Sequence, residues 1–217
     1  FWKEPDIALR VEIIRLLGET DDWIPFFFSI LRKEDSGNKE EEIILRWEAL
    51  RALAHWKVRE SLPFFFRLIE KEDFPSELKE EVDELLSLYD FSVSFYLFTM
   101  INSENPFFRE IALFALWERE DGNVVNYAHK MSNDRDKKVR NLSQTILWGE
   151  GEISHLTLQE EDLNSRLIRV LAKYEKGVNL LIQMGEKDPL LEEQIFESLG
   201  KTEDIAFTPC LKEKLKE

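Results

Sequence analysis

The side chains of this chain that could take part in chemistry are carboxylates, three histidines, one cysteine and one basic cluster. Carboxylates run together at Glu40–Glu42 and again between Glu80 and Glu84, and two carboxyl groups can work as a general acid and a general base. Both runs coincide with predicted helices, where water and the helix dipole favour acidic side chains. We therefore interpret both runs as solvated helix faces.

Neither a metal site nor a cofactor site is predicted. His55, His129 and His155 each lack a second His or Cys at the spacing of metal ligands. The single cysteine, Cys210, can form no intramolecular disulfide. No glycine-rich phosphate loop is present. We expect a protein that is not an enzyme and that uses no cofactor or metal ion.

The charge of the chain restricts its partners. The formal net charge is −15 and the sequence pI is about 4.8, so nucleic acid and anionic membranes are repelled and basic surfaces are favoured. The densest basic cluster, Arg135–Arg140, is too small to offset this field. The longest apolar runs, Trp23–Leu31 and Phe91–Ile101, are shorter than the about 18 residues that suggest a bilayer-spanning helix. We expect a protein or peptide partner, no nucleic acid and no membrane insertion.

A repeat underlies the elements that must position these side chains. "PFFF" occurs at Pro25–Phe28 and again at Pro63–Phe66, an offset of 38 residues. Before each copy stands a helical pattern, "LRVEIIRLL" from Leu9 and "LRWEALRAL" from Leu45, an offset of 36 residues. The two extra residues are expected in the turn between the helices, where insertion costs little.

The same apolar helical spacing begins seven times along the chain, and a second apolar helix follows most copies. A two-helix unit of this size cannot bury its apolar faces alone, so the units must stack. In the fifth unit only a short stretch of chain separates its first helix from the first helix of the sixth unit. A short second helix is therefore expected at Ile153–Leu158, with a distortion of the superhelix near residues 149–162. The second helices are predicted to begin near Trp23, Ser61, Phe91, Asn123, Gly177 and Ile205.

The stretch "SNDRDKKVRNLSQTILWGEG", Ser132–Gly151, resembles the first half of a HEAT repeat of the short phycobilisome-lyase type. In that family an Asp stands five residues before a Val-Arg pair that opens the first helix, and Asp134, Val139 and Arg140 match it. The Arg position is matched again by Arg10, Arg46 and Arg109. We expect Arg140 to bond to the turn around Asp134 and to hold consecutive units in register.

The resemblance implies the fold class: an all-α, right-handed superhelical solenoid of about seven two-helix HEAT-like repeats, forming one domain over residues 1–217. It also implies that second helices line a concave surface, which in this family commonly binds other proteins. The chain begins at Phe1 rather than Met, so we expect a fragment of a longer or processed protein, located in the cytoplasm.

The repeated phenylalanines suggest a site. Two helix stripes, Ile24-Phe27-Phe28-Leu31 and Leu62-Phe65-Phe66-Ile69, are expected to face the first helices. Left over are Phe26, Phe64 and, in the third unit, Phe95. These rings either pack between adjacent units or form an apolar strip on the concave surface. In the second case the partner-binding residues are Phe26, Ser29, Lys33, Phe64, Arg67, Lys71 and Phe95, because aromatic rings beside basic side chains suit an acidic, hydrophobic peptide.

The function predicted from these features is a non-enzymatic scaffold or adaptor that binds a partner protein or peptide. The alternative, which rests on the resemblance alone, is a lyase-like or chaperone-like enzyme subunit that acts on a tetrapyrrole-carrying protein.

The repeat makes a direct spectroscopic prediction. Far-ultraviolet circular dichroism of the purified protein should show a predominantly helical spectrum, because every repeat unit consists of two helices. A substantial sheet component would contradict the repeat assignment.

Overall fold

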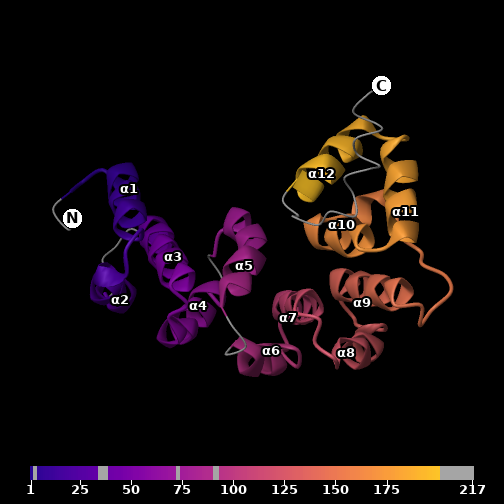
Figure 1. Ribbon diagram of the computed structural model, residues 1–217, viewed down its shortest axis with the longest axis horizontal. Helices are drawn as coiled ribbons and strands as arrows, with labels where there is room; N and C mark the ends of the chain where they lie inside the picture. Colours follow the sequence, from indigo (N-terminus) through magenta and orange to yellow (C-terminus); the bar gives the residue numbers. More distant parts are fainter. Residues whose placement is uncertain (2–3, 34–38, 72–73, 90–92, 201–217) are drawn as a thin grey trace. The chain divides into compact units, whose positions relative to one another are not determined.

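A computed structural model describes residues 1, 4–33, 39–71, 74–89 and 93–200 (Figure 1). Within these ranges the chain forms twelve α-helices and no strand, which confirms the all-α prediction. None of the described helices combines the length and the apolar character needed to cross a membrane. Cys210 and the helix predicted from Ile205 lie outside the described residues.

The chain divides into two compact units, Phe1–Tyr96 and Leu97–Glu217, called here the N-terminal unit and the C-terminal unit. The prediction of a single repeat domain over residues 1–217 stays a prediction. The N-terminal unit contains α1 (Ile7–Leu17), α2 (Ile24–Arg32), α3 (Lys39–His55), α4 (Leu62–Ile69) and α5 (Ser76–Leu88), and α6 (Ser94–Met100) lies at the division. The C-terminal unit contains α7 (Pro106–Glu118), α8 (Val124–Met131), α9 (Lys137–Gly149), α10 (Ser165–Ala172), α11 (Glu175–Gly185) and α12 (Pro189–Gly200).

Local sequence signals determine where several helices begin. The side chains of Asp6, Asn105, Asp136 and Asn164 accept hydrogen bonds from backbone N–H groups in the first turns of α1, α7, α9 and α10. Such caps satisfy donors that have no partner inside the helix. Proline stands in the first turn of α2, α4 and α7, where its missing N–H costs nothing.

In the N-terminal unit, α3 is the central element and packs against α1, α2, α4 and α5. From Trp47 to Ala54 every residue except Arg51 is buried. Because consecutive buried residues point in all directions around a helix, α3 is covered on every side. This arrangement is what the stacking of two-helix units requires, since α3 contacts both its own second helix and the first helices before and after it.

The turns of the first two repeats have equal lengths. Residues 18–23 separate α1 from α2, and residues 56–61 separate α3 from α4, which is six residues in each case. The expectation that two extra residues lie in the second turn is therefore wrong. They extend α3 at its carboxyl end instead, through Ala54 and His55.

The two PFFF segments bury their phenylalanines unequally. Phe27 and Phe65, the second ring of each, are fully buried, and Phe66 is 9% exposed. Phe28 is only half-buried, and its ring lies 5.9 Å from the ring of Phe64 on α4. The expectation that Phe28 faces the first helix is thus wrong, because this ring fills the space between successive second helices.

In the C-terminal unit, α9 packs against α7, α8 and α10, and α10 packs against α11 and α12. The side chains of α10 also reach α7. Arg166 pairs with Glu110 at 3.2 Å, and this pair is buried. Arg169 and Glu118 join the same two helices, and Lys173 and Glu120 join the residues that follow them. Helix α10 therefore contacts the first helices of both preceding repeats.

No helix forms between Gly149 and the short 3-10 turn Glu160–Asp162, so the expected second helix at Ile153–Leu158 is wrong. Gly151 adopts a left-handed conformation, with φ of 85°, and ends α9. The half-buried side chains of Ile153, Leu156 and Leu158 follow a spacing of three and then two residues. This spacing does not fall on one face of a helix.

Arginines of three first helices, in the first turns of α7 and α9 and further along α3, donate to main-chain carbonyl groups of the preceding segment. Arg46 donates to the carbonyl oxygen of Lys33 at 2.5 Å, and Arg109 donates to that of Ser103 at 2.7 Å. Arg140 donates to the carbonyl oxygen of Asp134 at 2.6 Å. The prediction that Arg140 bonds to this turn is confirmed.

The carboxylate of Asp134 binds Arg109 instead, at 2.7 and 2.9 Å. Burial alone would raise the pKa of Asp134. The hydrogen bonds from Arg109 and from the Asp136 N–H, with the charges of Arg109 and Arg140, outweigh burial and hold this pKa below its usual value. One carboxylate thus links the turn before α9 to α7, the first helix of the preceding repeat unit.

The variant Asp134→Asn should lower the free energy of unfolding by about 1–3 kcal/mol at pH 7, because Arg109 loses a charged partner. A carboxyl group whose pKa is lower in the folded state contributes its full stabilisation of the fold at pH values above its unfolded pKa of about 3.9. This contribution is lost as the pH falls through the pKa of the folded state. The difference in free energy of unfolding between wild type and variant, measured by urea denaturation, should therefore shrink below about pH 4. Glu161→Gln, at an exposed carboxylate, is the control; an equal loss there would contradict the prediction.

The burial difference within PFFF gives a second stability prediction. Phe27→Ala should destabilise the protein by about 3–5 kcal/mol, because it leaves a cavity in a closed core. Phe28→Ala removes a half-buried ring and should cost about 1–2 kcal/mol. Equal midpoint shifts of the two variants in thermal or urea unfolding would show that Phe28 is as deeply packed as Phe27.

Candidate functional site

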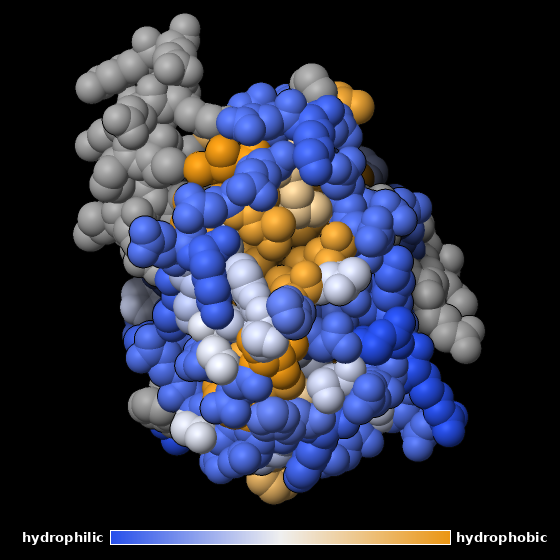
Figure 2. All heavy atoms as spheres, turned by 90° about the vertical axis from the view of Figure 1, so that its right-hand side faces the viewer, coloured by the Kyte–Doolittle hydropathy of each residue, from blue (hydrophilic) through white to orange (hydrophobic). Residues whose placement is uncertain are grey.

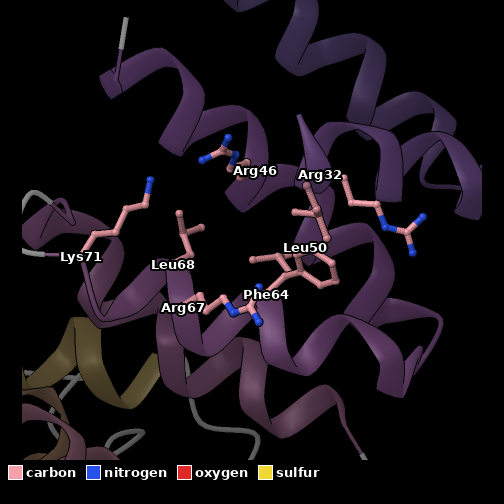
Figure 3. A pocket seen from close by; sticks show the side chains of 8 residues that line it. Arg32, Arg46, Leu50, Phe64, Arg67, Leu68 and Lys71 are labelled. Carbon is pink, nitrogen blue, oxygen red and sulfur yellow. The ribbon is translucent and has the colours of Figure 1, made fainter. Parts of the chain in front are cut away.

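Three helices of the N-terminal unit enclose a hollow of about 540 Å³, a volume typical of ligand sites. We call it the cationic hollow (Figure 3). Helix α2 contributes Leu31 and Arg32, α3 contributes Arg46 and Leu50, and the segment of α4 and its last turn contributes Phe64, Arg67, Leu68 and Lys71.

The floor of the cationic hollow is apolar. Leu31 and Leu68 are 7% and 3% exposed and show a small part of their surface there, and Leu50 behind them has no exposed surface. Phe64 is half-buried and meets Phe28, which closes the space between α2 and α4 at one end. An apolar side chain placed on this floor would lose contact with water over much of its surface, which favours binding.

The rim of the cationic hollow consists of Arg32, Arg46, Arg67 and Lys71, and none of its described lining residues is acidic. Arg46 is held in place by its bond to the Lys33 carbonyl, and Glu42 lies 4.0 Å from the same guanidinium nitrogen. The guanidinium carbon of Arg32 lies 5.0 Å from the centre of the Phe28 ring, a cation–π contact. Arg67 is exposed at the mouth.

This concentration of positive charge contrasts with the rest of the protein. The net charge is −15, so acidic side chains outnumber basic ones over the protein as a whole. Figure 2, coloured by hydropathy, shows one face on which hydrophilic side chains surround a central hydrophobic patch. Arg32 and Lys71 lie at the carboxyl ends of α2 and α4, where the helix dipole favours cations. Arg46 lies within α3, so this explanation does not extend to it. The charged side chains among the described lining of the hollow are therefore all basic, in a chain whose net charge is negative.

The side chains of the cationic hollow can bind but are poorly suited to bond-making chemistry. The described lining residues include no carboxylate, histidine, cysteine or hydroxyl group, so they offer no general base or nucleophile. Among the described residues, no group of three His, Cys, Asp or Glu side chains could hold a metal ion. The guanidinium groups can bind carboxylate or phosphate through two hydrogen bonds at once.

Three of the predicted site residues, Phe64, Arg67 and Lys71, come together in the cationic hollow. Lys33 contributes its carbonyl group, which accepts the bond from Arg46. Ser29 is exposed, and its hydroxyl donates to the Phe26 carbonyl at 2.6 Å.

The other two predicted rings have separate surroundings. Phe26 packs against Phe1 and Trp23, with ring centres 5.1 and 6.3 Å apart. Phe95 is 74% exposed and contacts Tyr96. The ring contacts between successive second helices involve Phe28 with Phe64 and Phe66 with Tyr96, rather than the ladder of Phe26, Phe64 and Phe95.

Sequence reasoning missed Arg32 and Leu50, and it assigned Arg46 and Leu31 to structural roles only. The one available signal was Arg32, because it follows Phe28 by four residues and therefore lies on the same side of α2. Arg46 and Leu50 come from another helix, and no local pattern relates them to α4.

The C-terminal unit contains a smaller hollow of about 330 Å³, and its one cation is already engaged. Lys173 binds Glu120 at 3.0 Å and lies 5.1 Å from the centre of the Trp117 ring. Burial, and then the bond to Glu150, raise the pKa of Tyr174 to about 12, so its hydroxyl stays protonated and donates to Glu150 at 2.6 Å. These contacts make the second hollow a packed structural feature.

Comparisons with protein-family models, with curated proteins and with solved structures found no match. The site is therefore interpreted from the geometry of the chain itself.

Proposed function

We propose that this protein is a non-enzymatic interaction scaffold, built of HEAT-like repeats in a right-handed solenoid, that binds an acidic and apolar segment of a partner protein in the cationic hollow. The observation that carries the proposal is the set of four cations around a floor of buried leucines in a chain of net charge −15. Such a site attracts anionic groups over a distance and holds apolar groups on contact.

Two features support the repeat assignment. At the position that the resemblance assigns to a helix-opening arginine, Arg109 and Arg140 each donate to the carbonyl group six residues earlier, and Arg46 donates to that of Lys33. First helices also pack on the first helices of neighbouring repeats, as α1 does on α3 and α7 on α9. Both features are expected where similar two-helix units stack.

A protein segment fits the cationic hollow better than nucleic acid. Phosphate backbones are bound mainly through rows of cations, and apolar floors contribute little to such binding. Here buried leucine side chains form the floor, and they need apolar groups opposite them. Peptides that combine Asp or Glu with Leu offer both kinds of group in one short segment.

The test uses fluorescently labelled peptides of 12 residues in which leucines are combined with glutamates or, in the matched peptide, with lysines. The glutamate peptide should bind the full-length protein, and the lysine peptide should not, as measured by anisotropy at two salt concentrations. Arg67→Glu should weaken binding at least tenfold, because it reverses a charge at the mouth of the hollow.

The control variant is Arg135→Glu, which makes the same charge change at an exposed residue of the C-terminal unit. Equal weakening by both variants would show that the net charge of the protein, rather than the cationic hollow, governs binding. Binding of the lysine peptide as tightly as the glutamate peptide would overturn the proposal.

A further inference from the structure

The wall that α4 contributes to the cationic hollow has the pattern of half a helix–helix interface. Phe64, Arg67, Leu68 and Lys71 stand at positions i, i+3, i+4 and i+7, which form one face of a helix. Helix α4 ends at Ile69, and the backbone N–H of Lys71 bonds to the carbonyl group of Leu68 three residues earlier, so a tight closing turn places Lys71 just beyond the helix. At about 1.5 Å per residue this face is about 10 Å long, or two helical turns.

The other walls complete a trough. Leu31 and Arg32 come from α2, and Arg46 and Leu50 come from α3, so cations stand on more than one side of the leucines (Figure 3). A ligand in this trough must present acidic groups to the rim and apolar groups to the floor along the same 10 Å. This requirement distinguishes between the conformations that a bound peptide can adopt.

An extended peptide meets the requirement poorly. Its side chains alternate between two faces. When two acids at i and i+2 reach Arg67 and Lys71, the residue between them points away from the hollow, so no apolar side chain covers the floor there. Its N–H and C=O groups would also be desolvated against Leu31, Phe64 and Leu68 without partners, which is costly.

A helix meets the requirement on both counts. Its backbone groups bond to one another, so an apolar floor leaves none of them unsatisfied. Acids at i and i+4 lie about 6 Å apart along its axis, and Arg67 and Lys71 are also four residues apart, along α4 and its closing turn. Apolar residues at i+1 and i+5, or at i+3 and i+7, project beside the acids and can rest on the leucines.

Resting on the proposed function, we infer that the ligand of the cationic hollow is two turns of an amphipathic helix of a partner protein. Two acidic residues four positions apart face Arg67 and Lys71, and leucine-type side chains lie on Phe64 and Leu68. The recognised feature is thus a register of charges on a helix, in addition to an acidic composition.

The experiment compares three labelled peptides of identical composition by anisotropy. The first peptide carries glutamates at i and i+4 beside leucines at i+3 and i+7. The second carries its glutamates at i and i+2. The third keeps the register of the first, but a proline and an alanine exchange places, so that the proline stands at the centre and the alanine at the terminus. The first should bind at least tenfold more tightly than the others, and circular dichroism should show helix gained on binding.

A charge exchange tests the pairing. Replacing Arg67 and Lys71 together by Glu should weaken binding of the first peptide at least a hundredfold and should create binding of a peptide with lysines at i and i+4. The matched control, Arg135→Glu with Lys138→Glu in the C-terminal unit, should change binding less than threefold. Melting curves establish whether each variant is folded. Where the double glutamate variant does not fold, the double variant Arg67→Gln with Lys71→Gln takes its place.

The outcomes separate this inference from the proposed function. Equal binding of all three peptides would overturn the helical ligand and leave the acidic-peptide scaffold intact. Absence of binding for all three at millimolar concentration would overturn both. Tighter binding of phosphatidylserine vesicles or of a 20-nucleotide single strand, lost in the Arg67 and Lys71 variant, would assign the hollow to a membrane surface or to nucleic acid and overturn both as well.

Discussion

The complete burial of the central first helices constrains the rest of this structure. Helix α3 is covered around its circumference, and so is α7, where every residue from Ile111 to Trp117 is buried. Polar atoms on such helices have little access to water, so each needs a partner on a neighbouring helix. Glu48 of α3 accordingly binds Arg15 of α1 at 2.8 Å, the indole N–H of Trp47 donates to Glu81 of α5 at 2.9 Å, and Glu110 of α7 binds Arg166 of α10 at 3.2 Å. These bonds fix how each helix lies along the next, because the alternative is an unpaired charge in the core.

The fold was largely readable in the sequence because the spacing of apolar residues reports which side of a helix is buried. The starts of α2, α4, α8 and α11 fall within three residues of the positions predicted from Trp23, Ser61, Asn123 and Gly177. Spacing does not report which neighbour covers a residue, and for this reason Phe28 was assigned to the wrong contact. The cationic hollow was only half predictable for the same reason. Arg67 and Lys71 share a helix with Phe64, whereas Arg46 joins them only after α3 has packed against α4.

The two PFFF copies show how one repeat can carry structure and function at separate positions. At the buried position the copies are identical, with Phe27 and Phe65 both enclosed by the core. At the exposed position two residues further on they differ, since Ser29 in the first copy corresponds to Arg67 in the second. A serine or an arginine there leaves the packing unchanged, because neither side chain enters the core. The charge of the hollow therefore depends on residues that the repeat itself leaves unconstrained.

The extended segment that replaces the fifth second helix has a consequence for engineering. Within the described part of the chain, Ser154–Leu158 form no hydrogen bond, and Ser154, His155 and Thr157 are exposed. The segment is held on both sides, by the backbone bonds of Glu152 and Ile153 to the carbonyl group of Leu147 and by the ion pair of Lys137 with Asp162 at 2.5 Å. Cutting the chain there, or splicing a reporter domain into it, would leave both anchors and every helix of the unit in place. Residues 154–158 are thus the natural position for an internal fusion or for new chain ends in a circular permutant.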